Sequence, residues 1–475
     1  MDKWQMTIGI ECHVQLATAT KLFSPADNDA RDKGPNSVVD PIDWGLPGML
    51  PLLNKRVVEL AVIAGKAMNA EIARVSRFDR KHYFYPDLPN GYQITQMYHP
   101  TILEGTVEAP MEDGGSVKVR INHAHIEMDA GKQTHYSDHS LVDLNRAGTP
   151  LIEIVTEPDM HSPQEAKAFC AELHKLMVYA GVTFGDLYHG NMRFDVNISV
   201  APAGSNELGK RAEVKNLNSF RSVERAAEYE FKRQVELLEK GERVVQETRG
   251  WDDAKGKTSS QRSKEDAQDY RYMPDPDIPP IVLTDDRIAE LQADMPQLPP
   301  YYRDKWSSLG LDKSVVDSLL SHQSYAVLIA SIQDSAGGDI AKRVAHWFAS
   351  GVSTDEDTAE VASNFVPEGY VELAEMVGKN ELSSTAAKEV FNELLTSDKS
   401  PREIAEAKNL LQVSDEGAIS AIVDEVLADP ASAKAVADFK AGNEKVIGFL
   451  VGQIMKKSQG KANPALAQKL IREKL

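Results

Sequence analysis

Cysteine and long apolar runs are scarce in this sequence. The 475 residues include two cysteines, Cys12 and Cys170, which gives no disulfide framework and fits a reducing compartment. No stretch reaches the roughly 18 consecutive apolar residues of a membrane helix. The first residues, MDKWQMTIGI, have neither the apolar segment of a signal peptide nor a transit-peptide composition. We therefore expect a cytoplasmic protein that has no membrane partner.

The common catalytic and nucleotide-binding motifs are also missing. Gly250 and the run Gly256-Lys257-Thr258 resemble a P-loop, but five residues separate the two glycines where that motif has four. The protein-kinase motifs, G-x-S-x-G, a C-x-x-C pair and H-E-x-x-H are absent as well. Any nucleotide site in this chain must be of a less common kind.

Positive charge is low overall and concentrated at one end. The chain has 53 Lys and Arg against 72 Asp and Glu, a formal charge of −19, which argues against nonspecific nucleic-acid binding by the whole surface. The stretch 445–475 is an exception, with one acid, Glu473, and seven basic residues: Lys445, Lys456, Lys457, Lys461, Lys469, Arg472 and Lys474. Such a segment suits binding to nucleic-acid phosphates. The alternative is an ordinary solvated helical face.

Acidic and imidazole side chains recur on the faces of strand-like segments. In 117–129, the odd positions carry three apolar residues and then His123, His125, Glu127 and Asp129. Alternation along a strand predicts that those four polar residues share one face. A second segment, 151–157, puts Glu153 and Glu157 on one face. Burying such groups is costly unless a cation or a substrate compensates them.

Two further segments repeat this pattern. Residues 7–16 alternate between an apolar face and one that bears Glu11 and His13, and strand 194–200 places Asp195 opposite its apolar face. Taken alone, 7–16 also fits a strand that faces bulk water. If all four strands share a sheet, its polar face is a carboxylate-rich cradle that favours Mg²⁺ or Mn²⁺ over zinc, and Mg²⁺ suggests a nucleotide-dependent reaction.

The stretch 78–96 is rich in aromatic and basic residues. Arg80 and Lys81 are candidates for phosphate contact, and the tyrosines are candidates for stacking on a base. The alternative is a small aromatic core beneath a loop.

The chain changes character along its length, from strands to helices. Two helices are predicted in the first part: one begins after Asn54, and another follows Ser162-Pro163-Gln164-Glu165 and places Cys170 in the core. After about residue 295 the pattern is helical. We predict an α+β fold with an N-terminal cradle domain (1–293) built on a largely antiparallel sheet with flanking helices. Two all-α domains follow, 294–408 and 409–475.

Several long motifs carry a family resemblance. They are IGIECHVQL, DRKHYFYPDLPNGYQITQ, HIEMDAGK, VDLNRAGTPLIEIVTEPD, AEVKNLNSF, DYRYMPDPDIPP and the C-terminal GFLVGQIMKKSQGKANP. In order and over nearly the whole chain, they resemble the GatB family, which supplies the kinase and transamidase component of the aspartyl/glutamyl-tRNA amidotransferases.

The resemblance implies an activity and partners. It implies a carbon–nitrogen ligase that uses ATP to phosphorylate the side-chain carboxylate of Glu-tRNA(Gln) or Asp-tRNA(Asn). Ammonia from glutamine, released by the A-type amidase subunit of the complex and delivered through a tunnel, then displaces the phosphate. A small C-type subunit makes the complex a heterotrimer. The sequence does not distinguish the two tRNA substrates.

The resemblance also implies site residues. By motif, the Mg²⁺ ligands are Glu11, His13, Glu127 and Glu153, with Asp195 as a weaker candidate. Arg80, Lys81 and Arg146 are our candidates for phosphate contact. Lys445, Lys456, Lys457 and Lys461 are our candidates for tRNA contact.

Two motifs depart from the family pattern. Met128 stands where the family usually has a second acid, and GNMRFD replaces GSxRCD before Asp195. Alternation points Met128 away from Glu127, which leaves the site intact.

Three rival interpretations can be weighed against the sequence. The related archaeal E-type subunit has an inserted domain for which 475 residues leave no room. A tRNA-binding scaffold without chemistry conflicts with intact Glu11, His13, Glu127 and Glu153. A free-standing metal-dependent hydrolase lacks a nucleophile or zinc motif here.

Overall fold

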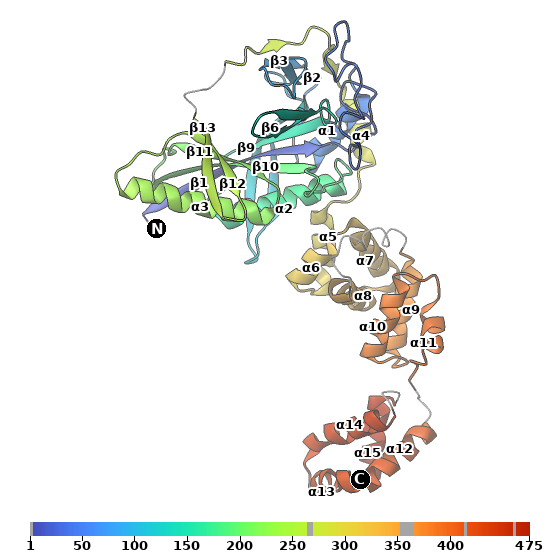
Figure 1. The fold of residues 1–475 in the computed structure, drawn as a ribbon. Helices are drawn as coiled ribbons and strands as arrows, with labels where there is room; N and C mark the ends of the chain where they lie inside the picture. Colours follow the sequence, from blue (N-terminus) through green and yellow to red (C-terminus); the bar gives the residue numbers. More distant parts are fainter. Residues whose placement is uncertain (1–2, 264–268, 352–364, 413–415, 459–461) are drawn as a thin grey trace. The chain divides into compact units, whose positions relative to one another are not determined.

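The computed structural model describes residues 3–263, 269–351, 365–412, 416–458 and 462–475. The chain divides into two compact units, 1–299 and 300–475 (Figure 1). The first contains a large, mostly antiparallel sheet with helices, and the second is helical. The predicted α+β class is therefore confirmed, while the predicted domain boundaries stay predictions.

An eight-stranded sheet organises the first unit. In spatial order its strands are β13 (Lys257–Ser263), β12 (Glu247–Asp252), β11 (Arg211–Leu217), β10 (Met192–Pro202), β1 (Trp4–Gln15), β9 (Pro150–Thr156), β6 (Ser116–Met128) and β5 (Gly105–Pro110). All neighbouring pairs are antiparallel except β11 and β12, which are parallel. The four strands with the predicted polar faces, β10, β1, β9 and β6, are consecutive neighbours. This order gathers their polar residues onto one surface.

The opposite face of the sheet is the apolar core. Ile8, Ile10 and Cys12 of β1 are buried there, and helices α2 (Pro163–Tyr179) and α3 (Phe220–Glu239) cover this face (Figure 1). Cys12 is fully buried, which raises the pKa of its thiol, so this cysteine serves packing.

Local signals fix the ends of α2. The Ser162 hydroxyl accepts a hydrogen bond from the Glu165 backbone N–H at 3.1 Å, and Pro163 begins the helix. Gly181, just beyond the end, has a φ of 68°, which favours glycine. The predicted helix is confirmed. Its capping box is only half formed, because the Glu165 carboxylate accepts from the N–H of His161, not of Ser162.

His123, His125 and Glu127 of β6 share one face as predicted, but strict alternation does not hold along the whole strand. The register against β9 shifts between Ile121 and His123, a β-bulge that inserts one extra residue. Before the bulge, odd residues such as Val119 face the core; after it, even residues such as Ala124 do. The bulge turns His123, His125 and Glu127 onto the polar face, so the apolar odd positions before it and the polar odd positions after it lie on opposite faces.

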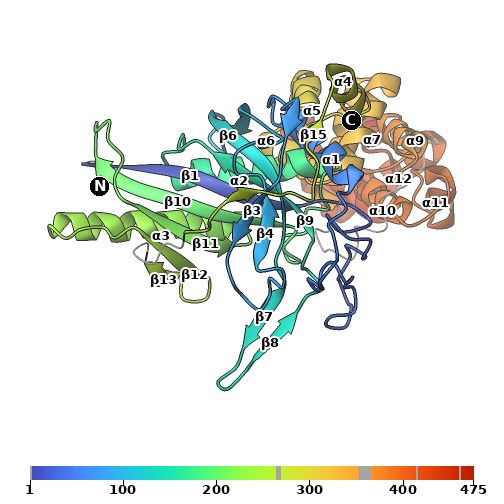
Figure 2. The same cartoon turned by 90° about the horizontal axis from the view of Figure 1, so that it is seen from above.

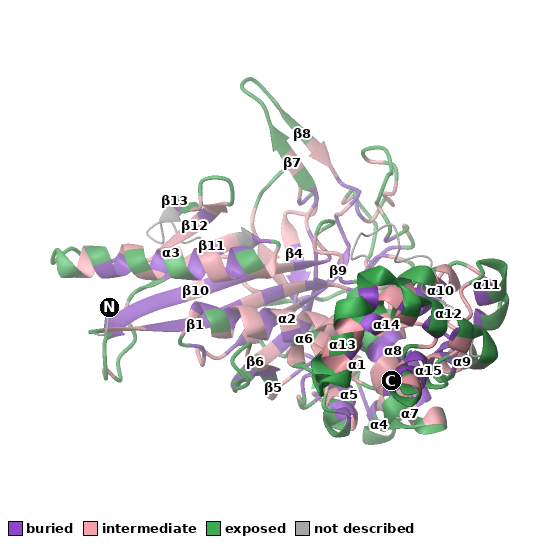
Figure 3. Cartoon of the chain, turned by 90° about the horizontal axis from the view of Figure 1, so that it is seen from below, coloured by how far each residue is buried: buried purple, intermediate pink, exposed green. Residues whose placement is uncertain are grey.

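Smaller sheets accompany the polar face. One consists of β14 (Met273–Pro274), β3 (Asp79–His82) and β4 (Tyr92–Thr95), and another of β15 (Ile281–Val282) and β2 (Val75–Ser76). Strands β7 (Lys132–His135) and β8 (Ser140–Asp143) form a hairpin that projects from the unit (Figure 2). Figure 3 contrasts this exposed hairpin with the buried strands β1 and β10. Helix α1 (Lys55–Ala67), capped by Asn54 as predicted, packs against α4 (Asp285–Ala293).

The second unit consists of short helices. They are α5 (Pro299–Trp306, which begins at the boundary), η2 (Ser307–Leu309), α6 (Lys313–Leu319), α7 (Gln323–Ala336), α8 (Gly338–Gly351), α9 (Pro367–Gly378), α10 (Ser384–Leu394), α11 (Pro401–Ala407), α12 (Glu416–Ala428), η4 (Pro430–Ser432), α13 (Ala433–Lys440), η5 (Glu444–Val446), α14 (Ile447–Lys457) and α15 (Pro464–Lys474). Helices α12, α14 and α15 share a core that includes Val423, Leu450 and Ile471.

Among the described residues, no single helix is long and apolar enough to cross a membrane. Helices α6 and α7 meet that test only jointly, as a pair bent by 115°.

Candidate active site

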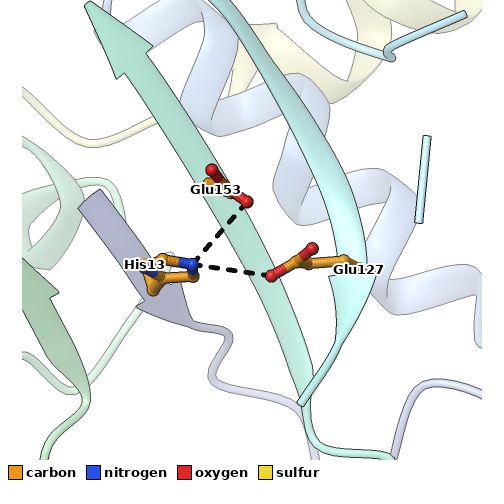
Figure 4. A group of neighbouring side chains, drawn as sticks. All are labelled: His13, Glu127 and Glu153. Atoms are coloured by element: carbon orange, nitrogen blue, oxygen red, sulfur yellow. Dashed lines mark ion pairs between the residues drawn. The ribbon is translucent and has the colours of Figure 1, made fainter. Parts of the chain in front are cut away.

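Three side chains from neighbouring strands converge on the polar face of the sheet. His13 lies opposite Glu153 in the β1–β9 register, and Glu127 reaches the same point from β6 (Figure 4). The His13 Nε2 atom lies 3.6 Å from a carboxylate oxygen of Glu127 and 3.6 Å from one of Glu153. We call these three residues the histidine–glutamate group. One ligand atom from each lies within 4.8 Å of the others, the geometry that a shared cation requires.

A second imidazole supports the two glutamates. His125 Nε2 lies 3.3 Å from Glu153 and 3.6 Å from Glu127, and its ring stacks on that of His123 with 5.3 Å between centroids. Burial lowers the pKa of His125, but hydrogen bonds to the two carboxylates outweigh burial and raise it to about 10. Burial raises the pKa of Glu153, but the neighbouring His125 lowers it by more than burial raises it. The net pKa of Glu153 therefore lies well below the usual range of a glutamate. The Nδ1 atom of His125 is buried and has no hydrogen-bond partner in the structure.

A second acidic cluster lies beside the first. Glu11, Asp195 and Glu213 come from β1, β10 and β11, with one oxygen of each within 4.8 Å of the others. Lys215 Nζ lies 3.1 Å from Asp195 and 3.2 Å from Glu213. We call these three acids the lysine-bound group. The structure thus places Glu11 and Asp195 together, whereas we predicted both as ligands of one site with His13, Glu127 and Glu153.

The electrostatics of the lysine-bound group reflect this crowding. Burial first, and then the neighbouring carboxylates Glu153 and Glu213, raise the pKa of Glu11. Burial lowers the pKa of Lys215, but Asp195 and Glu213 raise it by more than burial lowers it. The net pKa therefore lies above the usual range of a lysine. Asn197 also donates a hydrogen bond to Glu11 at 2.9 Å. The protein therefore supplies its own cation to this group.

The two basic residues of β3 have different surroundings. Successive strand residues point to opposite faces. Burial lowers the pKa of Lys81, while Glu127 leads the neighbouring groups that raise it above its usual range. Its Nζ lies 4.9 Å from the ring centroid of Tyr270. Arg80 instead pairs with Asp275 at 2.8 Å and Asp277 at 2.7 Å. The structure brings Lys81 to the site and leaves Arg80 in a carboxylate pair.

The aromatic residues around Lys81 mostly contact one another. Tyr83 packs edge-on against Tyr85 and Tyr270, with centroids 5.8 and 6.0 Å apart, whereas Phe84 is 86% exposed. The rings thus contact one another but are not buried as a core would be, since Tyr85 is also exposed, and both sequence-based alternatives stay open.

A third predicted phosphate contact, Arg146, lies at the edge of the site. Its Nε is 3.1 Å from Asp129, and its guanidinium donates to the backbone carbonyls of Ala130 and Gly131. The same Asp129 oxygen accepts a hydrogen bond from Arg193 at 2.9 Å. Arg193 lies opposite His13 across the β1–β10 register, which places it closer to the histidine–glutamate group.

Sequence reasoning did not select Glu213, Lys215 or Arg193. All three fall in motifs that carry or modify the family resemblance, AEVKNLNSF and GNMRFD. The signal that would have found them is alternation along β10 and β11, since Arg193 shares a face with Asp195 and Lys215 shares one with Glu213.

The predicted tRNA contacts lie in the last helices. Lys445 is exposed in η5, and Lys456 is exposed near the end of α14. Lys457 pairs with Glu425 of α12 at 2.6 Å, and two more tail cations, Arg472 and Lys474, pair with acids outside 445–475. Lys461 lies outside the described residues.

Comparison with known protein families identifies the class. The model described as the GatB/GatE catalytic domain matches residues 6–289, and that of the GatB domain matches residues 329–475. The sheet with its two acidic groups lies within the first match. The first unit therefore contains a catalytic domain of the GatB/GatE class.

Full-length relatives are more specific. The chain is 45% identical to the GatB subunit of the aspartyl/glutamyl-tRNA(Asn/Gln) amidotransferase of Halorhodospira halophila, over 100% of this chain and 99% of the relative. Identity is 44% to that of Geotalea uraniireducens and 42% to that of Rickettsia rickettsii, with coverage of 99% and 98% of those chains. The chain belongs to the GatB family of aspartyl/glutamyl-tRNA(Asn/Gln) amidotransferase subunits.

Proposed function

We propose that this chain catalyses the ATP-dependent step of tRNA transamidation. The γ-phosphoryl group of ATP passes to the side-chain carboxylate of Glu-tRNA(Gln) or Asp-tRNA(Asn), which yields ADP and an acyl phosphate. Ammonia then attacks the acyl carbon, phosphate leaves, and the amide forms. The observation that supports this most directly is the histidine–glutamate group with Lys81 beside it.

The histidine–glutamate group fits a resident Mg²⁺ ion. Glu127 and Glu153 offer hard carboxylate oxygens, and Mg²⁺ in phosphoryl-transfer sites is held by one or two carboxylates together with substrate phosphates. His13 would supply a third donor. When bound there, Mg²⁺ would neutralise phosphate charge that two carboxylates alone would repel.

The surrounding residues have distinct roles in this proposal. Phosphoryl transfer depends chiefly on positioning and charge stabilisation. Lys81, whose pKa Glu127 raises, would contact a phosphate oxygen. His125 pairs with both glutamates through its Nε2 atom and so orients their carboxylates.

The partners follow from the family. We propose that the chain works in a cytoplasmic heterotrimer, in which an A-type amidase subunit releases ammonia from glutamine and a small C-type subunit joins the two. The exposed lysines of the tail, Lys445 and Lys456, would contact tRNA phosphates and contribute affinity that carries little sequence information.

The test is amide formation that bypasses the amidase. The chain is reconstituted with its two partner subunits and supplied with either aminoacyl-tRNA, ATP, Mg²⁺ and free ammonia. Glu127→Gln preserves shape and removes charge, and we expect it to lower kcat/KM by about 100-fold or more while tRNA binding stays unchanged.

A matched control uses a glutamate of the same sheet. Glu108 of β5 is exposed and accepts a hydrogen bond from Ser116, so Glu108→Gln should leave the rate as in the wild type. Equal rates in Glu127→Gln and the wild type would remove the assignment of the site. No amide product with either tRNA would favour a tRNA-binding scaffold instead.

A further inference from the structure

A small cavity lies at the end of β1, beyond the histidine–glutamate group. Its volume is about 220 Å³, below the roughly 300–1,000 Å³ of sites for drug-sized ligands, so it suits a group the size of an amino acid. Gln15 of β1 contributes to its lining. Residues two apart on a strand share a face, so Gln15 follows His13 on the polar face, roughly 7 Å further along the strand. The cavity therefore lies one strand repeat from the histidine–glutamate group.

The cavity wall is polar but nearly neutral. Arg31 pairs with Asp29 at 2.8 Å and Arg146 pairs with Asp129 at 3.1 Å, so both guanidinium groups of the wall already have carboxylate partners. Amide and hydroxyl groups supply most of the remaining polar lining: Gln15, Thr18, Asn28, Thr149 and Asn191. A wall of this kind favours hydrogen bonding over the binding of a strong anion such as phosphate.

One buried acceptor of this wall lacks a donor. Asn28 is 5% exposed, and its amide nitrogen donates to the Leu16 carbonyl at 3.0 Å and to the carbonyl and hydroxyl oxygens of Thr18 at 3.2 Å each. These acceptors fix the orientation of the amide, because a flipped amide would place its oxygen against them. The Oδ1 atom then has no hydrogen-bond partner within the described part of the chain, which is unfavourable for a buried acceptor. An N–H donor of a ligand would satisfy it.

A second asparagine of the same region provides a contrast. The amide nitrogen of Asn54 also makes three contacts, with the carbonyl and hydroxyl oxygens of Thr20 and the carbonyl of Lys21. Its Oδ1, however, accepts a hydrogen bond from the Arg56 backbone N–H at 2.9 Å. Of the two asparagines, Asn28, which lines the cavity, is the one whose oxygen is left for a ligand.

Two small reacting groups of the proposed function carry N–H donors, namely the α-amino group of the aminoacyl ester and ammonia. Ammonia must attack beside the transferred phosphate, whereas this cavity lies one strand repeat away from His13 and is far larger than ammonia requires. An amino acid spans such a gap, because its α-amino group and its side-chain carboxylate lie at opposite ends. The aminoacyl group therefore fits both the place and the chemistry.

We propose that this cavity holds the α-amino end of the glutamyl or aspartyl group on the tRNA. Asn28 Oδ1 accepts a hydrogen bond from the α-amino group, and the side-chain carboxylate extends along β1 toward His13. The inference rests on the proposed function and adds to it a site that recognises the amino acid itself. An aminoacyl-tRNA whose α-amino group is acylated should therefore be a poor substrate.

The main experiment compares two substrates on the same enzyme. The reconstituted three-subunit complex receives ATP, Mg²⁺, free ammonia and either its aminoacyl-tRNA or the N-acetylated form of it. We expect acetylation to lower kcat/KM of the wild type by roughly tenfold or more. Asn28→Ala should reduce this ratio to about threefold or less, and any loss of folded protein cancels in the ratio. Asn54→Ala, which loses as many contacts of the amide nitrogen, should keep the wild-type ratio.

A second variant tests the cavity without changing Asn28. Gln15→Met keeps the length of the side chain and removes its amide, so it should raise KM for the aminoacyl-tRNA by about three- to tenfold and leave KM for ATP and for ammonia unchanged. The matched control is Gln5→Met, in another glutamine of β1 that lies outside the cavity and donates to the Ser205 carbonyl. Its KM values should equal those of the wild type.

Two kinds of result would overturn the proposal. Equal ratios in Asn28→Ala and the wild type, or a wild type that accepts both substrates equally, would leave Asn28 Oδ1 to a water molecule. A higher KM for ammonia in Asn28→Ala, with an unchanged ratio, would assign the cavity to ammonia. In each case the wild type still forms the amide, so the proposed function survives. No amide product from the wild-type complex would remove that function and this inference together.

Discussion

The two acidic groups of the sheet are close neighbours with opposite solutions to the same problem. Each brings carboxylates from several strands into one place, which is costly without positive charge. In the lysine-bound group, Lys215 lies within 3.2 Å of Asp195 and Glu213. In the histidine–glutamate group, His13 approaches the carboxylates no closer than 3.6 Å. In one group the ion-pair partner of the carboxylates is a lysine ammonium, whereas in the other the partners are the imidazoles of His13 and His125, the latter 3.3 Å from Glu153.

This difference distinguishes two ways of neutralising clustered carboxylates. The Lys215 ammonium joins Asp195 of β10 to Glu213 of β11, and an ammonium has no lone pair with which to bind a metal ion. An imidazole such as His13 is also a metal ligand when neutral, so the same side chain can hold the group together or bind an ion. The face thus has a lysine-paired half at β10–β11 and an imidazole-paired half at β1–β9–β6.

The largest expected effect tests which half binds a divalent cation. At a concentration near 100 times its Kd, Mg²⁺ or Mn²⁺ should stabilise the wild-type chain by about 2.7 kcal/mol. Glu153→Gln should lose most of this gain, because it removes a ligand of the histidine–glutamate group, whereas Glu213→Gln should keep it. Thermal unfolding with and without the cation measures both.

The contrast between these variants is itself the control. Each removes one carboxylate charge from the same face, so a general effect of charge would weaken both alike. A loss confined to Glu213→Gln would move the cation to the lysine-bound group.

Much of this site was predictable from alternation alone. The faces of β1, β9 and β10 follow period two, so Glu11, His13 and Glu153 were correctly placed opposite the core. Alternation failed in β6, because a bulge inserts one extra residue and so reverses which positions face the core, and no unambiguous sequence signal marks it. The polar residues of β6 were correctly selected as site candidates, but they lie opposite the core only because of the bulge.

The partners of charged residues were not predictable. Adjacent Arg80 and Lys81 must point to opposite faces of β3, but the choice depends on Asp275 and Asp277, almost 200 residues away. In the same way, the net charge of 445–475 omitted Asp424 and Glu425 of α12, which the fold brings to Lys474 and Lys457. Ion pairs between residues far apart in the sequence decide which charged side chains remain available to bind a ligand. Such pairs cannot be predicted from local composition.

A second prediction removes the built-in cation. Lys215→Met should destabilise the chain by about 2 kcal/mol, less than the roughly 3–5 kcal/mol of a fully buried pair, because the lysine side chain is 38% exposed. Chemical denaturation measures the change. Added Mn²⁺ should then stabilise Lys215→Met more than the wild type, since the two carboxylates paired with the lysine have lost their neutralising partner. An unchanged stability would show that the lysine is not what holds β10 and β11 in this arrangement.

The smallest effect extends the comparison to the tail, where the signs are reversed. Lys457 has a carboxylate partner in Glu425, whereas Lys456, its neighbour in α14, has none within ion-pair distance among the described residues. Each lysine that contacts a phosphate contributes about 0.9 to the slope of log K against log salt. Lys456→Gln should lower the tRNA-binding slope of the complex by about that amount, and Lys457→Gln by less than half of it. Equal slopes for the two variants would mean that tRNA displaces Glu425 from Lys457 on binding. The ion pair in the tail would then be weaker than the pairing of Lys215 with the acids of the sheet.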